Sequence, residues 1–426
     1  MLTAVVGINW GDEGKGRMVD LLSADCDAVV RYQGGNNAGH TVKNDQGTFI
    51  LHLLPSGILR EGVVNVMGPG MVIDLEALCD EINALEQAGV SVTPENLRIS
   101  DRAVIVLPYH VRQDVLEETR LGDRAYGSTR RGIAPVYGDK YLKKALHMND
   151  LLFPNTLKEK VDDILDWKNL TLEGVYGDSR MEVDEVLSWL HKWGDRLRPY
   201  ICDTSVFLEQ EDAKGGGILF EAQLGALRDI DYGIYPYTSS SNTLAAFAPI
   251  GSGLPGRHLD HVLGIVKAYS TCVGEGPFTV ELSGDEAEKL RQAGGEYGAS
   301  TGRPRRVGPF DAVATRYGVR MQGADELALT KLDVLSGFET IPVCTAYEID
   351  GVETEDFPFG DRLEKAKPVI TQLPGWLEDI SAVRRYEDLP ASARRYVEFL
   401  EEAIGAPFRY ISVGPDRDAY IEKSAA

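Results

Sequence analysis

Two carboxylates and a lysine stand close together near the start of the chain, at Asp12, Glu13 and Lys15, in the stretch GINWGDEGKG. A carboxylate can ligate Mg²⁺ or accept a proton, and a lysine ammonium is a point charge suited to phosphate. Glycines in the same stretch let the backbone turn tightly and approach a ligand closely. These residues predict a loop that binds phosphate and carries an acid–base group. An ordinary glycine-rich turn is the alternative.

The residues on either side of this loop predict the elements that hold it. The apolar run Thr3–Ile8 is typical of a buried strand, and Arg17–Leu22 has apolar residues on one face of a helix. A strand, a glycine-rich loop and a helix N-terminus together present N–H groups and a positive dipole end to an anion. The loop is not a P-loop, because Asn9 replaces the first glycine of that motif and Gly16 replaces its Ser or Thr.

Two further loops carry groups that suit an anionic ligand. The stretch QGGNNAGHT follows an expected strand over Asp27–Tyr32, and His40 is the only titratable side chain in it. Its glycines and asparagines suit close approach to a ligand, although a lone loop histidine can also be a surface residue. Arg124–Lys144 holds six basic residues and one acid in an acidic chain. It indicates a phosphate-facing patch, with a solvated charged loop as the alternative.

Four later segments add candidate binding groups. Tyr237–Ser241 is rich in hydroxyl side chains, and Tyr297–Arg306 places three arginines after a Ser-Thr-Gly turn. Arginine matches the geometry of carboxylates and phosphates. The stretch TKLD (330–333) resembles the guanine-reading motif of GTP-binding proteins, in which the aspartate accepts two hydrogen bonds from the base. Tyr410–Arg417 predicts a strand end and a turn that could contact a base. The alternatives are a serine-rich turn for the first segment, a basic surface loop for the second and a chance match for TKLD.

The remaining pattern indicates an α/β fold. Strands are expected at 63–67, 97–107 and 215–221, and the spacing over Asp74–Gly89 predicts a helix with Asp74 as N-cap. Strands alternating with helices favour a largely parallel sheet. Residues 155–200 are mostly helical by pattern, so we expect an insertion on the sheet domain there. No linker marks a boundary, so residues 1–426 are expected to form one domain.

Composition limits the class of protein. The net charge of −22 argues against nucleic acid as a partner, because phosphate binding needs a basic surface. The five cysteines are widely spaced without a CxxC pattern, which fits a reducing compartment. The sequence contains no run of 18 apolar residues and no signal-peptide pattern. We therefore expect a cytoplasmic protein with no membrane partner.

Taken together, these motifs resemble the adenylosuccinate synthetase family in the family's order, over nearly the whole chain. The resemblance implies a large, mostly parallel sheet flanked by helices, a P-loop-like nucleotide-binding architecture. It implies ligation of IMP and L-aspartate with GTP and Mg²⁺, through 6-phosphoryl-IMP, as the committed step from IMP to AMP. The segments that carry it are GINWGDEGKG (7–16), NNAGHT (36–41), GSTRRGI (127–133), DIDYGIYPYTSSSNT (229–243), STGRPRR (300–306), TKLD (330–333) and VGPDR (413–417).

The resemblance also implies roles for individual residues. Asp12 would take the proton from N1 of the purine, His40 would stabilise charge on the 6-oxygen and γ-phosphate, and Lys15 would neutralise phosphate. One Mg²⁺ per subunit would bind the Asp12 carboxylate and the Gly39 carbonyl. A homodimer is implied, with Lys143 reaching the IMP phosphate of the partner subunit.

The implied binding sites comprise these residues. For GTP they are Gly11, Asp12, Glu13, Gly14, Lys15, Gly16, Arg17, Gly39, His40, Thr41, Arg305, Lys331, Leu332, Asp333, Ser412, Val413 and Gly414. For IMP they are Asp12, Glu13, Gly14, Lys15, Asn37, Ala38, Gly39, His40, Thr129, Lys143, Gln223, Ser239 and Arg303. For aspartate they are Ala299, Ser300, Thr301, Gly302, Arg303, Pro304 and Arg305.

Three positions depart from the family's pattern. Lys143 stands where the family commonly has arginine. Lysine keeps the positive charge but lacks the planar guanidinium that can donate two hydrogen bonds to one phosphate. The family's EGAQG reads EAQLG from Glu221, so the glutamine that contacts IMP is displaced by one, and we expect Gln223 to serve. The family's TTGRG reads STRRG from Ser128, so Arg130 stands beside Thr129 in place of a glycine and is a candidate for an added phosphate contact.

Two other functions stay open at this stage. A related phage enzyme joins aspartate to a (d)GMP-type nucleotide, but it generally lacks an aspartate at the position of Asp12. A GTP-binding switch without synthesis would need a P-loop Ser or Thr, and position 16 is Gly. Both alternatives are therefore disfavoured.

Overall fold

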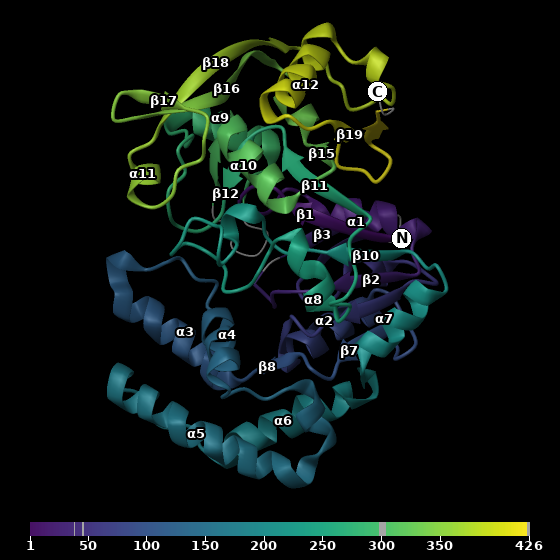
Figure 1. Cartoon of the computed structure of the whole chain (residues 1–426), viewed down its shortest axis with the longest axis vertical. Coiled ribbons are helices and arrows are strands. Elements are labelled where there is room, and N and C mark those ends of the chain that lie inside the picture. Colours follow the sequence, from purple (N-terminus) through teal and green to yellow (C-terminus); the bar gives the residue numbers. More distant parts are fainter. Residues whose placement is uncertain (38, 45–46, 298–303, 424–426) are drawn as a thin grey trace.

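The computed structural model describes residues 1–37, 39–44, 47–297 and 304–423. Within them, a ten-stranded sheet runs through the centre of the molecule (Figure 1). Neighbouring strands are parallel except for the last pair at one edge. In sheet order the strands are β20 (Tyr420–Glu422), β19 (Phe408–Ser412), β15 (Glu326–Thr330), β11 (His261–Lys267), β1 (Leu2–Gly7), β10 (Ile218–Glu221), β2 (Ala28–Arg31), β5 (Val64–Met67), β7 (Leu97–Ser100) and β9 (Ile201–Cys202).

Apolar side chains alternate between the two faces of β1 because successive residues of a strand point to opposite sides. Val5 packs in one cluster with Met18 and Val19. Ala4 and Val6 pack in another cluster. Both faces of the central strands are thus covered, which is why these strands read as continuous apolar runs. The prediction of a mostly parallel sheet with flanking helices is confirmed.

The helices connect and cover these strands. Asp74 caps the helix over residues 75–87 by accepting a hydrogen bond from Ala77 N at 3.1 Å. The helices are α1 (Lys15–Leu22), α2 (Leu75–Gln87), α3 (Pro108–Leu121), α4 (Ile133–Leu142), α5 (Pro154–Tyr176), α6 (Val183–Leu197), α7 (Thr204–Ala213), α8 (Ala248–Ser252), α9 (Gly284–Gly294), α10 (Ala312–Gln322), α11 (Asp361–Glu364) and α12 (Ala391–Ile404).

Smaller sheets lie around the central one. The largest is at the top of Figure 1, beside α12, and contains two long antiparallel strands, β16 and β18. The members of the smaller sheets are β3 (His40–Asn44) with β4 (Gly47–Leu51), β6 (Val72–Asp74) with β8 (Val104–Val106), β12 (Ser270–Cys272) with β13 (Arg306–Gly308), and β14 (Phe310–Asp311), β16 (Phe338–Ile349), β17 (Val352–Thr354) and β18 (Lys367–Trp376). The sequence did not predict the β3–β4 hairpin, because glycine and polar residues obscure its alternation.

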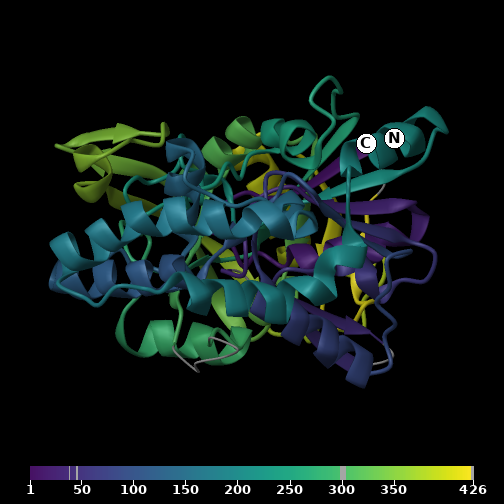
Figure 2. The ribbon, with the colours of Figure 1, turned by 90° about the horizontal axis from the view of Figure 1, so that it is seen from below.

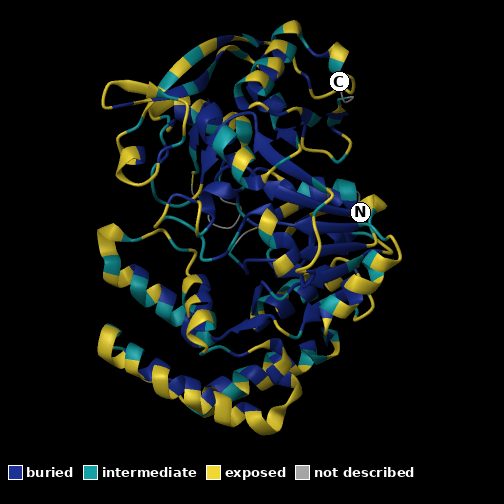
Figure 3. Cartoon of the chain, in the orientation of Figure 1, coloured by how far each residue is buried: buried dark blue, intermediate teal, exposed yellow. Residues whose placement is uncertain are grey.

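Two long helices, α5 and α6, form the face opposite that small sheet. Seen from below they lie side by side across the molecule (Figure 2), and their outer surfaces are exposed while the central strands are buried (Figure 3). Helical structure over 155–200 was predicted and is present. Among the described residues, none of the helices combines the length and apolar character that crossing a membrane demands.

Candidate active site

The carboxyl ends of the parallel strands bring the candidate loops to one edge of the sheet. The loop after β1 owes its shape to Glu13, a buried residue whose carboxylate accepts hydrogen bonds from Asn9 N at 3.1 Å and Gly11 N at 2.8 Å. Lys15, also buried, donates to the other oxygen of Glu13 at 2.9 Å. Glu13 is therefore occupied inside the loop, although the sequence offered it equally with Asp12 for Mg²⁺ or a proton.

Asp12 is directed differently from Glu13. It adopts a left-handed backbone conformation, with φ of 60°, and its side chain is 29% exposed. Its Oδ2 lies 3.1 Å from Arg305 Nη2, and Asp12 lines a cavity of about 810 Å³. The loop thus holds one carboxylate for its own structure and presents the other to the cavity.

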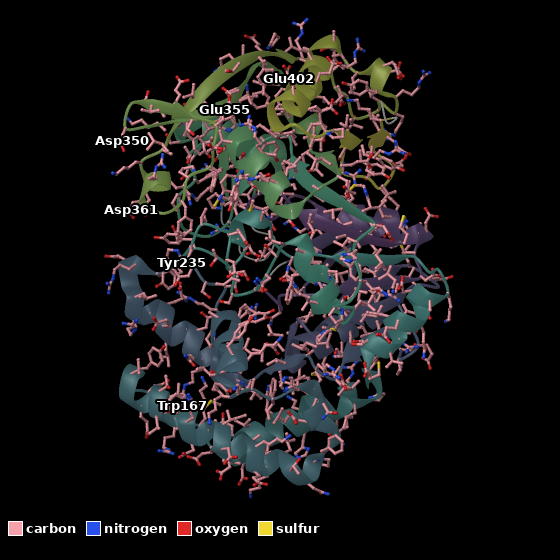
Figure 4. The ribbon with its side chains drawn as sticks, in the orientation of Figure 1. Trp167, Tyr235, Asp350, Glu355, Asp361 and Glu402 are labelled. Carbon is pink, nitrogen blue, oxygen red and sulfur yellow. The ribbon has the colours of Figure 1, made fainter. Side chains whose placement is uncertain are left out.

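The cavity collects several of the residues that the sequence assigned to IMP. Asn37, Gly39, Thr129 and Ser239 line it together with Asp12. They come from loops after β2, before α4 and after β10. Two aromatic side chains of its wall, Trp167 of α5 and Tyr235, are labelled in Figure 4. A cavity of this size suits a ligand as large as a nucleotide.

Gln223 is not among the lining residues. Its side chain is buried and donates from Nε2 to Gly35 O at 2.9 Å, and its Oε1 is buried without a hydrogen-bond partner among the described residues. Leu224 stands on the cavity wall instead, with a left-handed φ of 60°. Lys143 also has a positive φ, at the end of α4, and lies outside the lining with an exposed side chain.

His40 is buried beside a carboxylate that the sequence analysis did not assign to the site. Its Nδ1 pairs with Glu221, which also accepts hydrogen bonds from Ser56 N at 2.7 Å and Ser56 Oγ at 2.6 Å. Arg31 is the register neighbour of Glu221 on β2. Burial alone would raise the pKa of Glu221, but His40, Arg31 and Ser56 hold it at about 2. An ionised Glu221 fixes Nδ1 of His40 as the donor.

A second group of candidate residues lies at the ends of β15 and β19. Asp333 Oδ1 is buried without a hydrogen-bond partner among the described residues, and burial raises the pKa of Asp333. Lys331 has a left-handed φ of 60° and donates to Gly294 O at 2.8 Å. Arg17 contacts Ser412 Oγ and Gly414 O, joining the start of α1 to the turn after β19. An unpaired buried carboxylate needs donors, as a base with adjacent N–H groups would supply.

The aspartate site is described only in part. Ala299, Ser300, Thr301, Gly302 and Arg303 lie outside the described residues, as does Ala38. Arg305 is described, and its two terminal nitrogens reach Asp12 at 3.1 Å and Glu296 at 2.8 Å.

The residues that could hold Mg²⁺ are a carboxylate and a backbone carbonyl. Asp12 and Gly39 both line the cavity, and oxygen donors of these types suit Mg²⁺. In the described part of the chain, no three His, Cys, Asp or Glu side chains gather as a metal site of their own. The donor set therefore fits an ion that arrives with substrate phosphates, because Mg²⁺ commonly uses one or two carboxylates plus phosphate oxygens.

Sequence reasoning missed three residues of this region. Glu221 and Glu296 are buried carboxylates that contact His40 and Arg305, and Leu224 forms part of the cavity wall. Glu221 ends an apolar strand as its only charged residue, and that local signal could have identified it. Glu296 gives no comparable signal, because its partners are distant in the sequence.

Comparison with known proteins gives consistent matches. The family model described as adenylosuccinate synthetase matches residues 4–421. The adenylosuccinate synthetase of Caldanaerobacter subterraneus is 46% identical over 421 residues, covering 99% of this chain and 98% of that protein. The enzyme of Listeria welshimeri is 45% identical over 422 residues, with the same coverage of both chains.

Solved structures extend the comparison. The fully ligated adenylosuccinate synthetase of Plasmodium falciparum superposes with a TM-score of 0.93 at 34% identity, covering 99% of this chain and 100% of that chain. A succinoaminodeoxyadenylate synthetase of cyanophage S-2L, bound to dGMP and dATP, superposes with a TM-score of 0.61 at 20% identity, covering 99% and 94%. The second likeness shows a shared fold alone.

Proposed function

The chain belongs to the adenylosuccinate synthetase family, and on this premise we propose that its cavity is where this ligase joins IMP to L-aspartate with GTP, the committed step from IMP to AMP. The proposal rests mainly on the position of the Asp12 carboxylate at the cavity. Its neighbour Glu13 is used within the loop, whereas Asp12 lines the cavity beside Arg305. A carboxylate placed in this way can act on a substrate proton.

The reaction begins at the purine ring. Asp12 accepts the proton from N1 of IMP, and the electron pair raises the nucleophilicity of the 6-oxygen. That oxygen attacks the γ-phosphorus of GTP, the bond to the β,γ-bridging oxygen breaks, and GDP leaves. The product of this step is 6-phosphoryl-IMP, so a poor leaving group at C6 has become a good one.

The second step forms the carbon–nitrogen bond. The amine of L-aspartate attacks C6, phosphate leaves with the original 6-oxygen, and the amine gives up its proton. His40 supports both steps by donating to the 6-oxygen and the γ-phosphoryl group. Because Glu221 accepts from Nδ1 of His40, Nε2 is the nitrogen available for that role. Lys15 supplies positive charge at the foot of the loop.

Selection of GTP rests on the group near β15 and β19. Asp333 accepts hydrogen bonds from N1–H and the 2-amino group of guanine, and the stem of Lys331 covers the base. The buried, unpartnered Oδ1 of Asp333 supports this role. The turn Ser412–Gly414, tied to Arg17, completes the pocket.

One Mg²⁺ per subunit would be held by the Asp12 carboxylate and the Gly39 carbonyl. When bound, it neutralises negative charge on the GTP phosphates. The remaining assignments follow the sequence analysis: Asn37, Thr129 and Ser239 for IMP, and residues 299–305 for aspartate.

The chain acts as a homodimer of one α/β domain with the helical insertion 155–200, in the cytoplasm. Tyr141 and Leu142, next to Lys143, are 77% and 61% exposed. Large apolar side chains exposed at a helix end favour burial against a second copy, which brings Lys143 to the partner's IMP phosphate. The cysteines, all free, fit a reducing compartment.

An omission assay tests the reaction. Phosphate release and adenylosuccinate absorbance are followed with IMP, aspartate and GTP, and then with each one left out. We expect both signals only with all three. Aspartate-dependent release with dGMP but not IMP would instead indicate the nucleotide specificity of the phage relative. Phosphate release from GTP that depends on neither IMP nor aspartate would indicate a GTP-binding switch.

Two variants refine the assay. Asp12→Ala should abolish turnover and leave GTP binding mostly intact, because the lost step is proton removal. Asp184→Ala, an exposed carboxylate in the first turn of α6, is the control and should match the wild type. Turnover of Asp12→Ala at the control rate would refute the role of Asp12.

A further inference from the structure

A buried carboxylate lies between the two ends of the site without belonging to any ligand set named so far. Glu296 follows α9, and its side chain has no exposed surface. Among the described residues, four donors surround it: Lys267 Nζ at 3.0 Å, Tyr269 OH at 2.5 Å, Lys331 Nζ at 2.7 Å and Arg305 Nη1 at 2.8 Å. Both oxygens of the carboxylate are therefore engaged in hydrogen bonds.

The donors are divided between the two oxygens. Oε1 accepts from Lys267, Tyr269 and Lys331, and Oε2 accepts from Arg305. Burial opposes ionisation of Glu296, but the charges of Lys267 and Lys331 keep its pKa below the usual range. The carboxylate therefore carries no proton at neutral pH and places its negative charge among three cations, of which Arg305 also pairs with Asp12.

Two of these cations lead to different parts of the site. Lys331 lies two residues before Asp333, at the guanine end. Arg305 uses its other terminal nitrogen to reach Asp12 at 3.1 Å, at the catalytic and aspartate end. Arg305 is also tied to Glu296 through the backbone, since Arg305 N donates to Glu296 O at 3.0 Å. A continuous chain of contacts thus runs from Lys331 through Glu296 and Arg305 to Asp12.

We propose that Glu296 is a positioning residue that fixes Lys331 and Arg305 relative to each other, and so couples guanine selection to aspartate binding and to Asp12. This inference rests on the function proposed above. It differs from a purely structural role because it predicts joint changes at the guanine site and at the aspartate site.

The substitution Glu296→Gln tests the coupling with little change of volume. A glutamine amide can accept on one side only, because its nitrogen is a donor that repels the cation it faces. If the oxygen faces Lys331, Arg305 loses its anchor, and if it faces Arg305, Lys331 and Lys267 lose theirs. Either orientation interrupts the chain of contacts, so Lys331 and Arg305 are no longer held in place relative to each other.

We expect Glu296→Gln to raise the KM for aspartate and weaken the preference for GDP over IDP in direct binding, each by about tenfold, the equivalent of one hydrogen bond to a charged group. The KM for IMP should stay within about twofold. Glu286→Gln is the matched control, because Glu286 is an exposed carboxylate in the first turn of the same helix, α9. It should leave all three quantities unchanged.

A double variant tests the same coupling if Glu296→Gln alone does not fold. Glu296→Gln with Lys267→Met removes one buried charge of each sign and leaves Lys331 and Arg305 unanchored, so both effects should persist. Unchanged KM and binding preference in a folded variant, or a loss of kcat alone, would overturn the proposal. Nucleotide binding is measured without turnover, so failure of the proposed reaction in the wild type is distinguished from failure of this coupling.

Discussion

Replacing Asp333 by asparagine gives a quantitative test of guanine recognition. Asp333 Oδ1 is buried and unpartnered among the described residues, so guanine can supply its missing donors. A hydrogen bond to a charged group contributes about 1.5–3 kcal/mol, and losing the bond to the 2-amino group changes affinity by about 10- to 150-fold. ITP lacks that amino group. The wild type should therefore prefer GTP over ITP by a factor in this range.

In Asp333→Asn the preference should fall to within about threefold, because an amide nitrogen now opposes a donor of the base. The same variant should gain activity with XTP, whose 2-oxo group accepts from the new N–H. The assay compares kcat/KM for GTP, ITP and XTP. Asp379→Asn, an exposed carboxylate that accepts from Ser381 N at 2.9 Å, is the control and should keep the wild-type preference.

Stability gives a second readout for Asp333→Asn. Burial raises the pKa of Asp333. At neutral pH the ionised carboxylate therefore lowers the free energy of unfolding, and a neutral asparagine at this position does not. The Tm of the variant should equal or exceed that of the wild type at neutral pH. An unchanged ratio of GTP to ITP in such a folded variant would refute the guanine-reading role.

Three further outcomes are expected. Burial lowers the pKa of His110 from 6.5 to about 4, so its contribution to folding is present above pH 6.5 and is lost as pH falls towards 4. The difference in free energy of unfolding between wild type and His110→Asn, measured by urea denaturation, should shrink by about 3 kcal/mol over that window, and a constant difference would contradict this. Glu221→Gln should lower kcat by roughly 10- to 100-fold with little change in the KM for IMP, because it loosens His40; a change in KM alone would contradict the assignment. Lys143→Ala and Asp12→Ala should each be impaired, and their mixture should recover about a quarter of wild-type activity through hybrid dimers, whereas an active monomer in sedimentation would contradict the shared site.

Local patterns predicted much of the fold because local rules form those elements. The helix after Asp74 appears where its N-cap and apolar spacing place it. The hairpin of β3 and β4 was not predicted, since glycine and polar residues obscure the alternation of its apolar side chains. The candidate loops were expected directly after apolar strands. In a parallel sheet such loops lie together at the edge formed by the carboxyl ends of the strands.

The sequence suggests the residue types of the candidate site but does not specify their contacts. Asp12 lines the cavity, whereas Glu13 is occupied by the loop's own N–H groups, a distinction that spacing alone does not encode. Gln223 is directed at the backbone of Gly35, and Leu224 takes a left-handed conformation on the cavity wall. Contacts between distant segments, as between Glu296 and Lys267, follow from the tertiary arrangement.

The most direct test follows the oxygen that the proposed mechanism transfers. IMP labelled with ¹⁸O at the 6-position is turned over with GTP and aspartate, and the phosphate released is analysed by mass spectrometry. If Asp12 activates the 6-oxygen to capture the γ-phosphoryl group, each phosphate should carry one ¹⁸O atom, and Asp12→Ala should release none. Unlabelled phosphate from the wild type, formed in step with adenylosuccinate, would contradict the mechanism.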